Sequence, residues 1–294
     1  MKTLITGAFS LTPALRQELE NMGLEITFLA DERARVETPE QYEAAICNGL
    51  FLYNDIARFE KLRFVQLTSA GLDRVPLDYC REKGIRVENA RGVYSVPMAE
   101  FALWGVLQLY KQGKFFTGNQ RAHRWEKHRG LLELAGKTVC ILGCGSVGAE
   151  CAKRFEAFGC RVLGIATSAR EQEHFEAVYA MESLMDMLPQ ADIVVLTLPL
   201  TEQTKHLMGR EAFAAMKPGS VLVNLARGAI VDTDALVAAL ETKLGGAVLD
   251  VFEEEPLGED SPLWDLENVV LTPHNSFVGE GNRQRLIDTV LRNF

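Results

Sequence analysis

Three side chains that can do chemistry each follow an apolar run in the second half of the chain. Arg227 follows SVLVNLA, Glu255 comes shortly after AVLDVF, and His274 follows VVLTP. Ligands of an open parallel sheet bind outside the carboxyl ends of its strands, so we expect the three side chains at one edge. The arginine fork matches a carboxylate, and a histidine that a glutamate keeps protonated can give a proton to a developing alkoxide. These residue types therefore predict the reduction of a 2-keto acid.

A glycine-rich loop earlier in the chain indicates the source of the electrons. The sequence GCGSVG at 143–148 directly follows the apolar run TVCIL and precedes a helical pattern. In G-x-G-x-x-G the first glycine permits a tight turn, the second lets backbone approach a pyrophosphate, and the third lets the helix pack on the strand. The alternatives are a glycine turn without a ligand and a methyltransferase loop. We predict a dinucleotide site that includes Gly143, Gly145, Ser146, Val147 and Gly148.

The end of the next predicted strand bears on which dinucleotide is bound. An acidic residue about 20 positions after the glycine loop is expected to bind the ribose 2′-hydroxyl of NAD. Here the strand ends IATSAR at 165–170, with no carboxylate. Thr167, Ser168 and Arg170 suit a 2′-phosphate instead. We predict NADP or NAD as the cofactor, with NADP favoured.

Composition excludes several other classes of protein. The chain has 31 basic and 40 acidic residues and a net charge of −9, so no nucleic-acid partner is expected. Its longest apolar stretches, at 101–110 and 193–200, fall short of the roughly 20 residues that cross a bilayer, so no membrane partner is expected. The start of the chain resembles a first strand more than a signal peptide. Its six cysteines form no C-x-x-C pair, which favours reduced core thiols, no metal site and a cytoplasmic location.

Short apolar runs alternate with longer helical patterns, which predicts an α/β fold with parallel sheets. A length of 294 residues suits two domains. The first domain is expected to have strands near 3–6, 25–29, 44–47, 64–68 and 86–88. The second is expected to have six parallel strands, with continuous apolar runs that indicate burial on both faces. A helix at about 98–110, with Pro97 in its first turn, should link them.

Several motifs in register then carry a family resemblance over nearly the whole chain. They are SAGLD at 69–73, the glycine loop with AFGCRVLG behind it, LPLTEQT at 198–204, NLARGAIVD, GAVLDVFEEEPL, SPLW and TPH. With these motifs the chain resembles the D-isomer-specific 2-hydroxyacid dehydrogenases. The resemblance implies two doubly wound parallel-sheet domains, with a Rossmann dinucleotide domain at 92–275 inserted into a flavodoxin-like substrate domain at 1–91 and 276–294. It also implies a homodimer, because relatives commonly pair through the dinucleotide domain.

The resemblance also implies roles for individual residues. Arg227 and His274 would bind the substrate, Glu255 would pair with His274, and the backbone N–H groups of Ala70 and Gly71 would hold the substrate carboxylate. Asp250 would meet the nicotinamide carboxamide, and the alternative role for it is a cap of its strand end. Further positions that would line the cofactor are Ser95, Leu198, Pro199, Thr204, Leu225 and Ala226. His206 is expected to make a structural hydrogen bond.

The resemblance leaves the substrate open. A small 2-keto acid such as glyoxylate or hydroxypyruvate is expected, and a phosphoglycerate dehydrogenase-like enzyme is the nearest rival. A formate dehydrogenase would place glutamine beside its histidine, whereas this chain has Glu255. From another class, an NAD(H)-sensing corepressor would keep the same site as a binding module without turnover.

Overall fold

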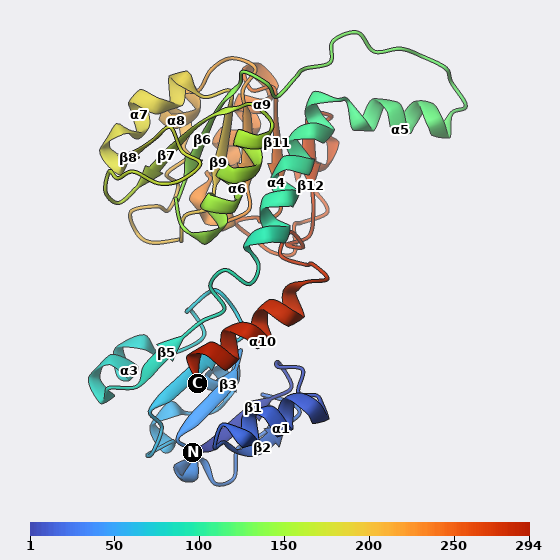
Figure 1. The fold of residues 1–294 in the computed structure, drawn as a ribbon. Coiled ribbons are helices and arrows are strands. Elements are labelled where there is room, and N and C mark those ends of the chain that lie inside the picture. The colour runs from blue at the N-terminus through green and yellow to red at the C-terminus, as the bar shows by residue number, and fades with distance from the viewer. The chain divides into compact units, whose positions relative to one another are not determined.

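The chain divides into two compact units in the computed structural model, which describes all residues 1–294 (Figure 1). Unit 1 comprises Met1–Tyr94 and Gly279–Phe294, and unit 2 comprises Ser95–Val278. The boundaries expected from the sequence, after residues 91 and 275, lie a few positions earlier. Both chain termini therefore belong to unit 1.

Unit 1 is built on a five-stranded sheet in which every pair of neighbours is parallel. The strand order is β2-β1-β3-β4-β5, the order of flavodoxin-like folds. Its strands are β1 (Lys2–Thr6), β2 (Glu25–Leu29), β3 (Ala44–Cys47), β4 (Phe64–Leu67) and β5 (Arg86–Glu88). Its helices are α1 (Pro13–Asn21), α2 (Leu50–Tyr53), α3 (Leu77–Lys83) and α10 (Asn282–Asn293). The flavodoxin-like α/β prediction is confirmed.

The last helix, α10, completes the core of unit 1. Val290 of α10 is fully buried with Leu19 of α1 and with Ile5 and Ile46 of the sheet. Neighbouring residues in the same strands, such as Leu4, point to the opposite cluster. Alternate residues of a strand face opposite sides of a sheet, so the two clusters are its two faces. The last helix of the chain, α10, thus covers one face of the sheet to which the first strand, β1, belongs.

Unit 2 contains a seven-stranded parallel sheet in the order β12-β11-β10-β9-β6-β7-β8. The order reverses between β9 and β6, as in doubly wound nucleotide-binding folds. The strands are β6 (Thr138–Leu142), β7 (Arg161–Ala166), β8 (Ala177–Ala180), β9 (Ile193–Leu196), β10 (Val221–Asn224), β11 (Gly246–Leu249) and β12 (Val269–Leu271). The prediction of six strands was wrong, because β8 is a short edge strand in which Val178 alone is buried.

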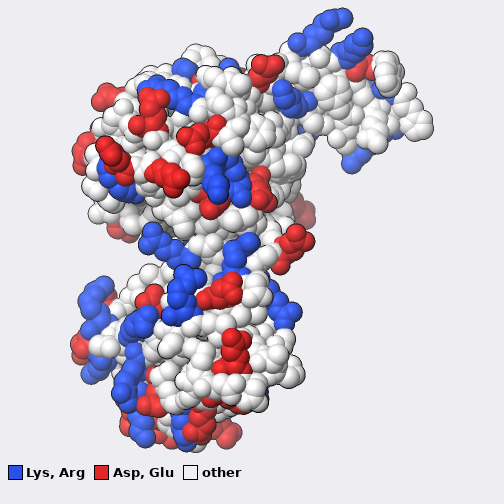
Figure 2. Space-filling view, viewed as in Figure 1, with Lys and Arg blue, Asp and Glu red and all other residues white.

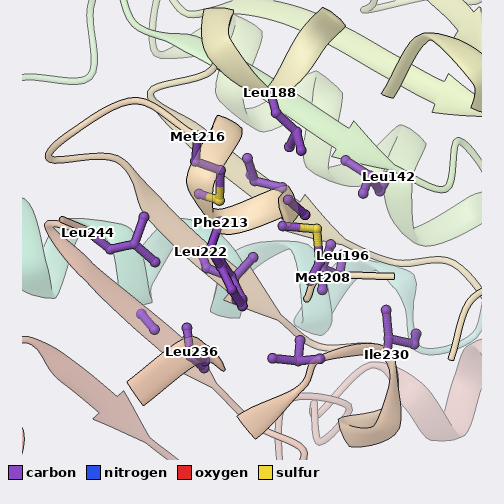
Figure 3. Packing of buried hydrophobic residues seen from close by; sticks show 14 of the residues in the cluster. Leu142, Leu188, Leu196, Met208, Phe213, Met216, Leu222, Ile230, Leu236 and Leu244 are labelled. Carbon is purple, nitrogen blue, oxygen red and sulfur yellow. The ribbon is translucent and has the colours of Figure 1, made fainter. Parts of the chain in front are cut away.

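Helices cover both faces of this sheet. The helices α4 (Ser95–Tyr110) and α6 (Ser146–Ala157) share a buried cluster with Ile193 and Val195 of β9. The intervening residues Val194 and Leu196 join the opposite cluster, which Figure 3 shows from close by. That cluster also takes in the helices α7 (Leu184–Met187), α8 (Arg210–Ala215) and α9 (Thr233–Thr242). The continuous apolar runs are therefore strands buried on both sides, as predicted.

One helix of unit 2, α5 (Gly113–Arg121), does not join either cluster. Figure 1 shows α5 and the segment that follows it standing off the sheet of unit 2. None of the helices in the chain combines the length and the apolar character needed to cross a membrane.

Candidate active site

The glycine loop links β6 to α6, as the motif requires. Gly143 has φ 102°, and a Cβ added there would lie 2.5 Å from the amide nitrogen of Leu198. A Cβ on Gly148 would lie 2.1 Å from the carbonyl oxygen of Gly143. These two glycines therefore allow the turn and the close packing of α6 on the sheet.

Gly145 has a different environment, and it points to a ligand. A Cβ on Gly145 would meet no atom within 4 Å, so packing of the protein does not explain the glycine. Gly145 is also the N-cap of α6, and no side chain caps this helix end. The free N–H groups and the open approach suit a pyrophosphate at the positive end of the helix. The loop thus fits a dinucleotide.

Beyond β7 the chain folds back on the glycine loop. Arg170 donates from Nη2 to the carbonyl oxygen of Cys144 at 3.1 Å and from Nε to Oε1 of Gln172 at 3.0 Å. Gln172 donates to the same Cys144 oxygen at 3.1 Å. Thr167 and Ser168 are exposed at the end of the strand. Gln172 was not predicted from the sequence, because nothing in its surroundings marks an amide that binds backbone.

The segment that follows β9 carries three of the residues expected to line the cofactor: Leu198, Pro199 and Thr204. The hydroxyl of Thr204 donates to the carbonyl oxygen of Pro199 at 2.8 Å and accepts from the N–H of Thr201 at 2.7 Å. Thr204 is thus a brace of this loop. Leu198 is buried, as are the expected positions Leu225 and Ala226 after β10. Ser95 is also buried, and its hydroxyl has no hydrogen-bond partner.

The histidine and the glutamate of the predicted trio lie in direct contact. Nδ1 of His274 is 2.9 Å from Oε2 of Glu255. The other carboxylate oxygen of Glu255 accepts from the N–H of Phe252 at 3.1 Å. Because Glu255 engages Nδ1, the Nε2 of His274 is the nitrogen available to a substrate. The two side chains are 44% and 37% exposed, so this nitrogen is reachable from solvent.

The arginine of the trio makes no hydrogen bond or ion pair with the other two residues. Arg227 follows β10 and is exposed, and its guanidinium makes one side-chain hydrogen bond, from Nη1 to the carbonyl of Ala226 at 2.7 Å. It forms no ion pair, so its charge is free for an anionic ligand. The strands β10, β11 and β12 are neighbours in the sheet, which places Arg227, Glu255 and His274 after the carboxyl ends of adjacent strands.

Asp250 holds the loop that carries the histidine. Its carboxylate is fully buried and accepts from the Thr272 hydroxyl at 2.7 Å, the Asn275 N–H at 2.8 Å and the Ser276 N–H at 2.9 Å. Its carbonyl oxygen accepts from the N–H of His274 at 2.7 Å. His274 itself has φ 50°, a left-handed conformation that these contacts stabilise. Asp250 therefore braces the loop that follows β12 and carries His274.

An apolar pocket of about 520 Å³ opens beside His274 and Glu255. Apart from these two residues and Thr272, its lining is apolar: Phe252, Pro256, Leu257, Trp264, Leu271 and Pro273. A few polar side chains in the lining of an apolar pocket are typical of small-molecule sites. This pocket could not be predicted from the sequence, because its lining comes from three separate segments.

In unit 1, the loop after β4 presents free backbone donors. The N–H groups of Ala70 and Gly71 donate to no other protein group, whereas their carbonyls accept from Asn89 Nδ2 at 2.6 Å and Ser69 Oγ at 3.0 Å. The loop is thus fixed through its carbonyls. Free N–H groups on a fixed loop suit an anionic ligand.

A parallel sheet with a glycine loop at its reversal point, followed by a histidine–glutamate pair, defines a nicotinamide-dependent oxidoreductase. Residues 103–276 match the family described as D-isomer specific 2-hydroxyacid dehydrogenase, NAD binding domain. The chain belongs to this family, as the sequence motifs predicted. It is an oxidoreductase of 2-hydroxy acids.

Relatives and solved structures agree with this assignment. The chain is 39% identical over 245 residues to (S)-sulfolactate dehydrogenase of Chromohalobacter salexigens, covering 81% of this chain and 79% of that one. It is 36% identical over 244 residues to glyoxylate/hydroxypyruvate reductase A of Arabidopsis thaliana, covering 81% and 76%.

Two solved structures of relatives contain a nicotinamide dinucleotide. One is a D-isomer specific 2-hydroxyacid dehydrogenase from Xanthobacter autotrophicus in complex with NADPH and MES (TM-score 0.77, 30% identity, 98% of this chain and 93% of that one). The other is D-lactate dehydrogenase from Aquifex aeolicus with NAD and lactic acid (TM-score 0.78, 26% identity, 99% and 93%).

Proposed function

We propose that the protein reduces a small 2-keto acid to the D-2-hydroxy acid, with Arg227, Glu255 and His274 as its catalytic residues. The observation that carries this proposal is the 2.9 Å contact between His274 and Glu255, with the uncommitted Arg227 after the neighbouring strand. A reductase of glyoxylate and hydroxypyruvate among the relatives agrees with a short substrate.

Each residue of the trio has one task in the reaction. A nicotinamide held by the glycine loop would, when bound, supply the hydride for the carbonyl carbon. Arg227 binds the substrate carboxylate with its planar fork and orients the carbonyl group. His274 gives the proton on Nε2 to the carbonyl oxygen as negative charge develops there. Glu255 holds Nδ1 and stabilises the imidazolium before that transfer.

Unit 2 would hold the nucleotide, and unit 1 has a loop of its own that suits a carboxylate. The uncapped end of α6 at Gly145, Ser146 and Val147 supports a pyrophosphate site. Asp250 and Ser95 would border the nicotinamide, and the unpartnered hydroxyl of Ser95 supports its part in this. The free N–H groups of Ala70 and Gly71 support a carboxylate-binding loop in unit 1.

The preferred nucleotide would be NADPH. No carboxylate ends β7, and Arg170 is fixed against the glycine loop by its 3.1 Å hydrogen bond to Cys144. A guanidinium in that place pairs with a 2′-phosphate, and Thr167 and Ser168 add hydroxyl donors. Glu171 and Glu173, which follow Arg170 in the chain, act against this preference.

The proposal extends to assembly and compartment. Trp125, just beyond α5, is 98% exposed, which suits burial against a second copy of the chain in a homodimer. All six cysteines are buried free thiols, and burial raises the pKa of Cys144 to about 11 and of Cys140 to about 12. Unpaired thiols suit the reducing cytoplasm.

A panel of 2-keto acids tested with NADH and with NADPH examines the proposal. We expect turnover of a short keto acid such as glyoxylate or hydroxypyruvate, with kcat/KM at least about tenfold higher for NADPH. Turnover confined to 3-phosphohydroxypyruvate would point to the phosphoglycerate branch of the family. Negligible rates with every acid and both nucleotides would contradict the proposed function, and a tenfold preference for NADH would overturn the cofactor choice.

A further inference from the structure

A second histidine–glutamate pair lies next to the catalytic trio in unit 2. Nε2 of His206 is 2.6 Å from Oε1 of Glu253, and Oε2 of Glu253 accepts from both the N–H of Thr233, at 2.9 Å, and its hydroxyl. We call His206, Glu253 and Thr233 the clamp. His206 was expected to make a structural hydrogen bond, and Glu253 is its partner.

The clamp joins three segments that follow neighbouring strands. His206 lies in the segment after β9, Thr233 begins α9 beyond β10, and Glu253 lies in the loop after β11. Glu253 is two residues from Glu255 and follows Phe252, whose N–H donates to Glu255. A movement of Glu253 would therefore be passed directly to the carboxylate that holds His274.

The clamp also reaches the turn that carries Arg227. The N–H of His206 donates to the carbonyl of Ala229 at 2.8 Å. In the same turn, a Cβ on Gly228 would lie 1.8 Å from the carbonyl carbon of Phe252, so the two backbones are pressed together. The turn that carries Arg227 and the loop that carries Glu255 thus both contact residues that the clamp holds in place.

Stability alone does not explain the clamp. The side chains of His206 and Glu253 are 43% and 32% exposed, and ion pairs so exposed add little to the free energy of unfolding. His206 nevertheless adopts φ 50°, an uncommon conformation for a residue with a side chain. Burial opposes the charge on Glu253, but its hydrogen bonds with Thr233 and His206 outweigh burial and lower the pKa of Glu253.

We propose that His206 and Glu253 are positioning residues for the reduction, an inference that rests on the proposed function. They hold Glu255 at the distance that orients His274 and hold the turn of Arg227 against the same loop. They would act on the reaction through Glu255 and Arg227.

The chain offers a matched control for this proposal. Nδ1 of His174 is 2.6 Å from Oε2 of Glu156, and His174 also has positive φ, at 69°. Glu156 lies near the end of α6, away from the segments of the trio. Glu156→Ala thus removes an equally short histidine–glutamate contact from the same unit without touching the clamp.

The test compares wild type, Glu253→Ala, Glu253→Gln and Glu156→Ala with the best keto acid at saturating nucleotide. Rates are expressed per nucleotide-binding site, so that a loss of folded protein does not count. We expect Glu253→Ala to lower kcat by about ten- to a hundredfold and to raise KM for the keto acid, because small misplacements of catalytic groups cost that much. Glu253→Gln, which keeps hydrogen-bonding atoms at the clamp, should recover most of kcat, and Glu156→Ala should stay within about twofold of wild type.

Amide hydrogen exchange provides a readout that needs no turnover. We expect faster exchange at residues 227–230 and 252–255 in Glu253→Ala, and no change there in Glu156→Ala. Unchanged kcat and KM in Glu253→Ala while wild type turns over would overturn the positioning role. Unchanged exchange in Glu253→Ala would also overturn the positioning role, even if no keto acid were reduced. If wild type shows no turnover but the exchange pattern is as expected, only the proposed function is contradicted.

Discussion

At the scale of single residues, the site depends on how His274 is held. Its N–H donates to Asp250, its Nδ1 meets Glu255, and its ring lies edge-on to Phe277 with 6.2 Å between ring centroids. These contacts fix a left-handed residue whose remaining nitrogen is free. A proton donor so constrained needs little reorganisation when the substrate arrives.

Two glycines of the same loop have opposite surroundings, which gives a residue-scale prediction. Gly148→Ala should destabilise the protein by about 1–3 kcal/mol, because the new Cβ meets backbone at 2.1 Å. Gly145→Ala should fold normally, since its Cβ meets no atom within 4 Å, but it should raise the Kd for nucleotide by about tenfold or more. Thermal unfolding and nucleotide titration of both variants check this.

Each variant serves as the control for the other. Normal nucleotide affinity in a fully folded Gly145→Ala would show that the open side of Gly145 is not where the pyrophosphate lies. An unchanged Tm in Gly148→Ala would mean that α6 can move away from the glycine loop without loss of stability. This result would contradict the close packing at Gly148.

At the scale of elements, most of the fold could be predicted because strand patterns and turn residues agree. The run IVVL of β9 is apolar at every position and is buried on both faces. β8 could not be predicted, because AVYA is short and half-exposed and is held by pairing with β7 along the sheet edge. Local sequence does not encode such pairing, since the partner strand supplies the hydrogen bonds.

The arm formed by residues 111–133, which includes α5, gives an element-scale prediction. It carries the exposed side chains of Phe116, Trp125, Leu131 and Leu132, and residues 111–129 hold six basic residues against one acidic residue in a chain of net charge −9. Figure 2 shows Lys and Arg gathered on this projecting part of unit 2. A basic apolar arm suits the acidic body of a second copy.

Light scattering during size exclusion tests the dimer. We expect a mass of about twice 32.7 kDa for wild type, and dissociation in Trp125→Asp, because a charge replaces the most exposed aromatic side chain of the arm. Phe28→Asp, at a 47%-exposed position on β2 of unit 1, is the matched control and should remain dimeric. A wild-type mass of a single chain would refute the arm as a dimer contact.

At the scale of the whole molecule, each unit contributes its own kind of anion-binding group. Unit 2 offers the N-terminus of α6 and the side chain of Arg227, whereas unit 1 offers the N–H groups of Ala70 and Gly71. Motifs in the sequence predicted these positions because each lies in a short local pattern. The sequence could not reveal the clamp or the carboxylate network of Asp250, because they join residues that only folding brings together: His206 with Glu253, and Asp250 with Ser276.

The central claim is that His274 gives the proton in the reduction of a 2-keto acid. The most direct measurement is kcat of His274→Gln against wild type, with the Kd for nucleotide measured on the same preparations. We predict that kcat falls by at least about a hundredfold while the Kd changes little, because the imidazole is lost and the glycine loop is untouched. A kcat equal to that of wild type would remove His274 from the mechanism and contradict the account.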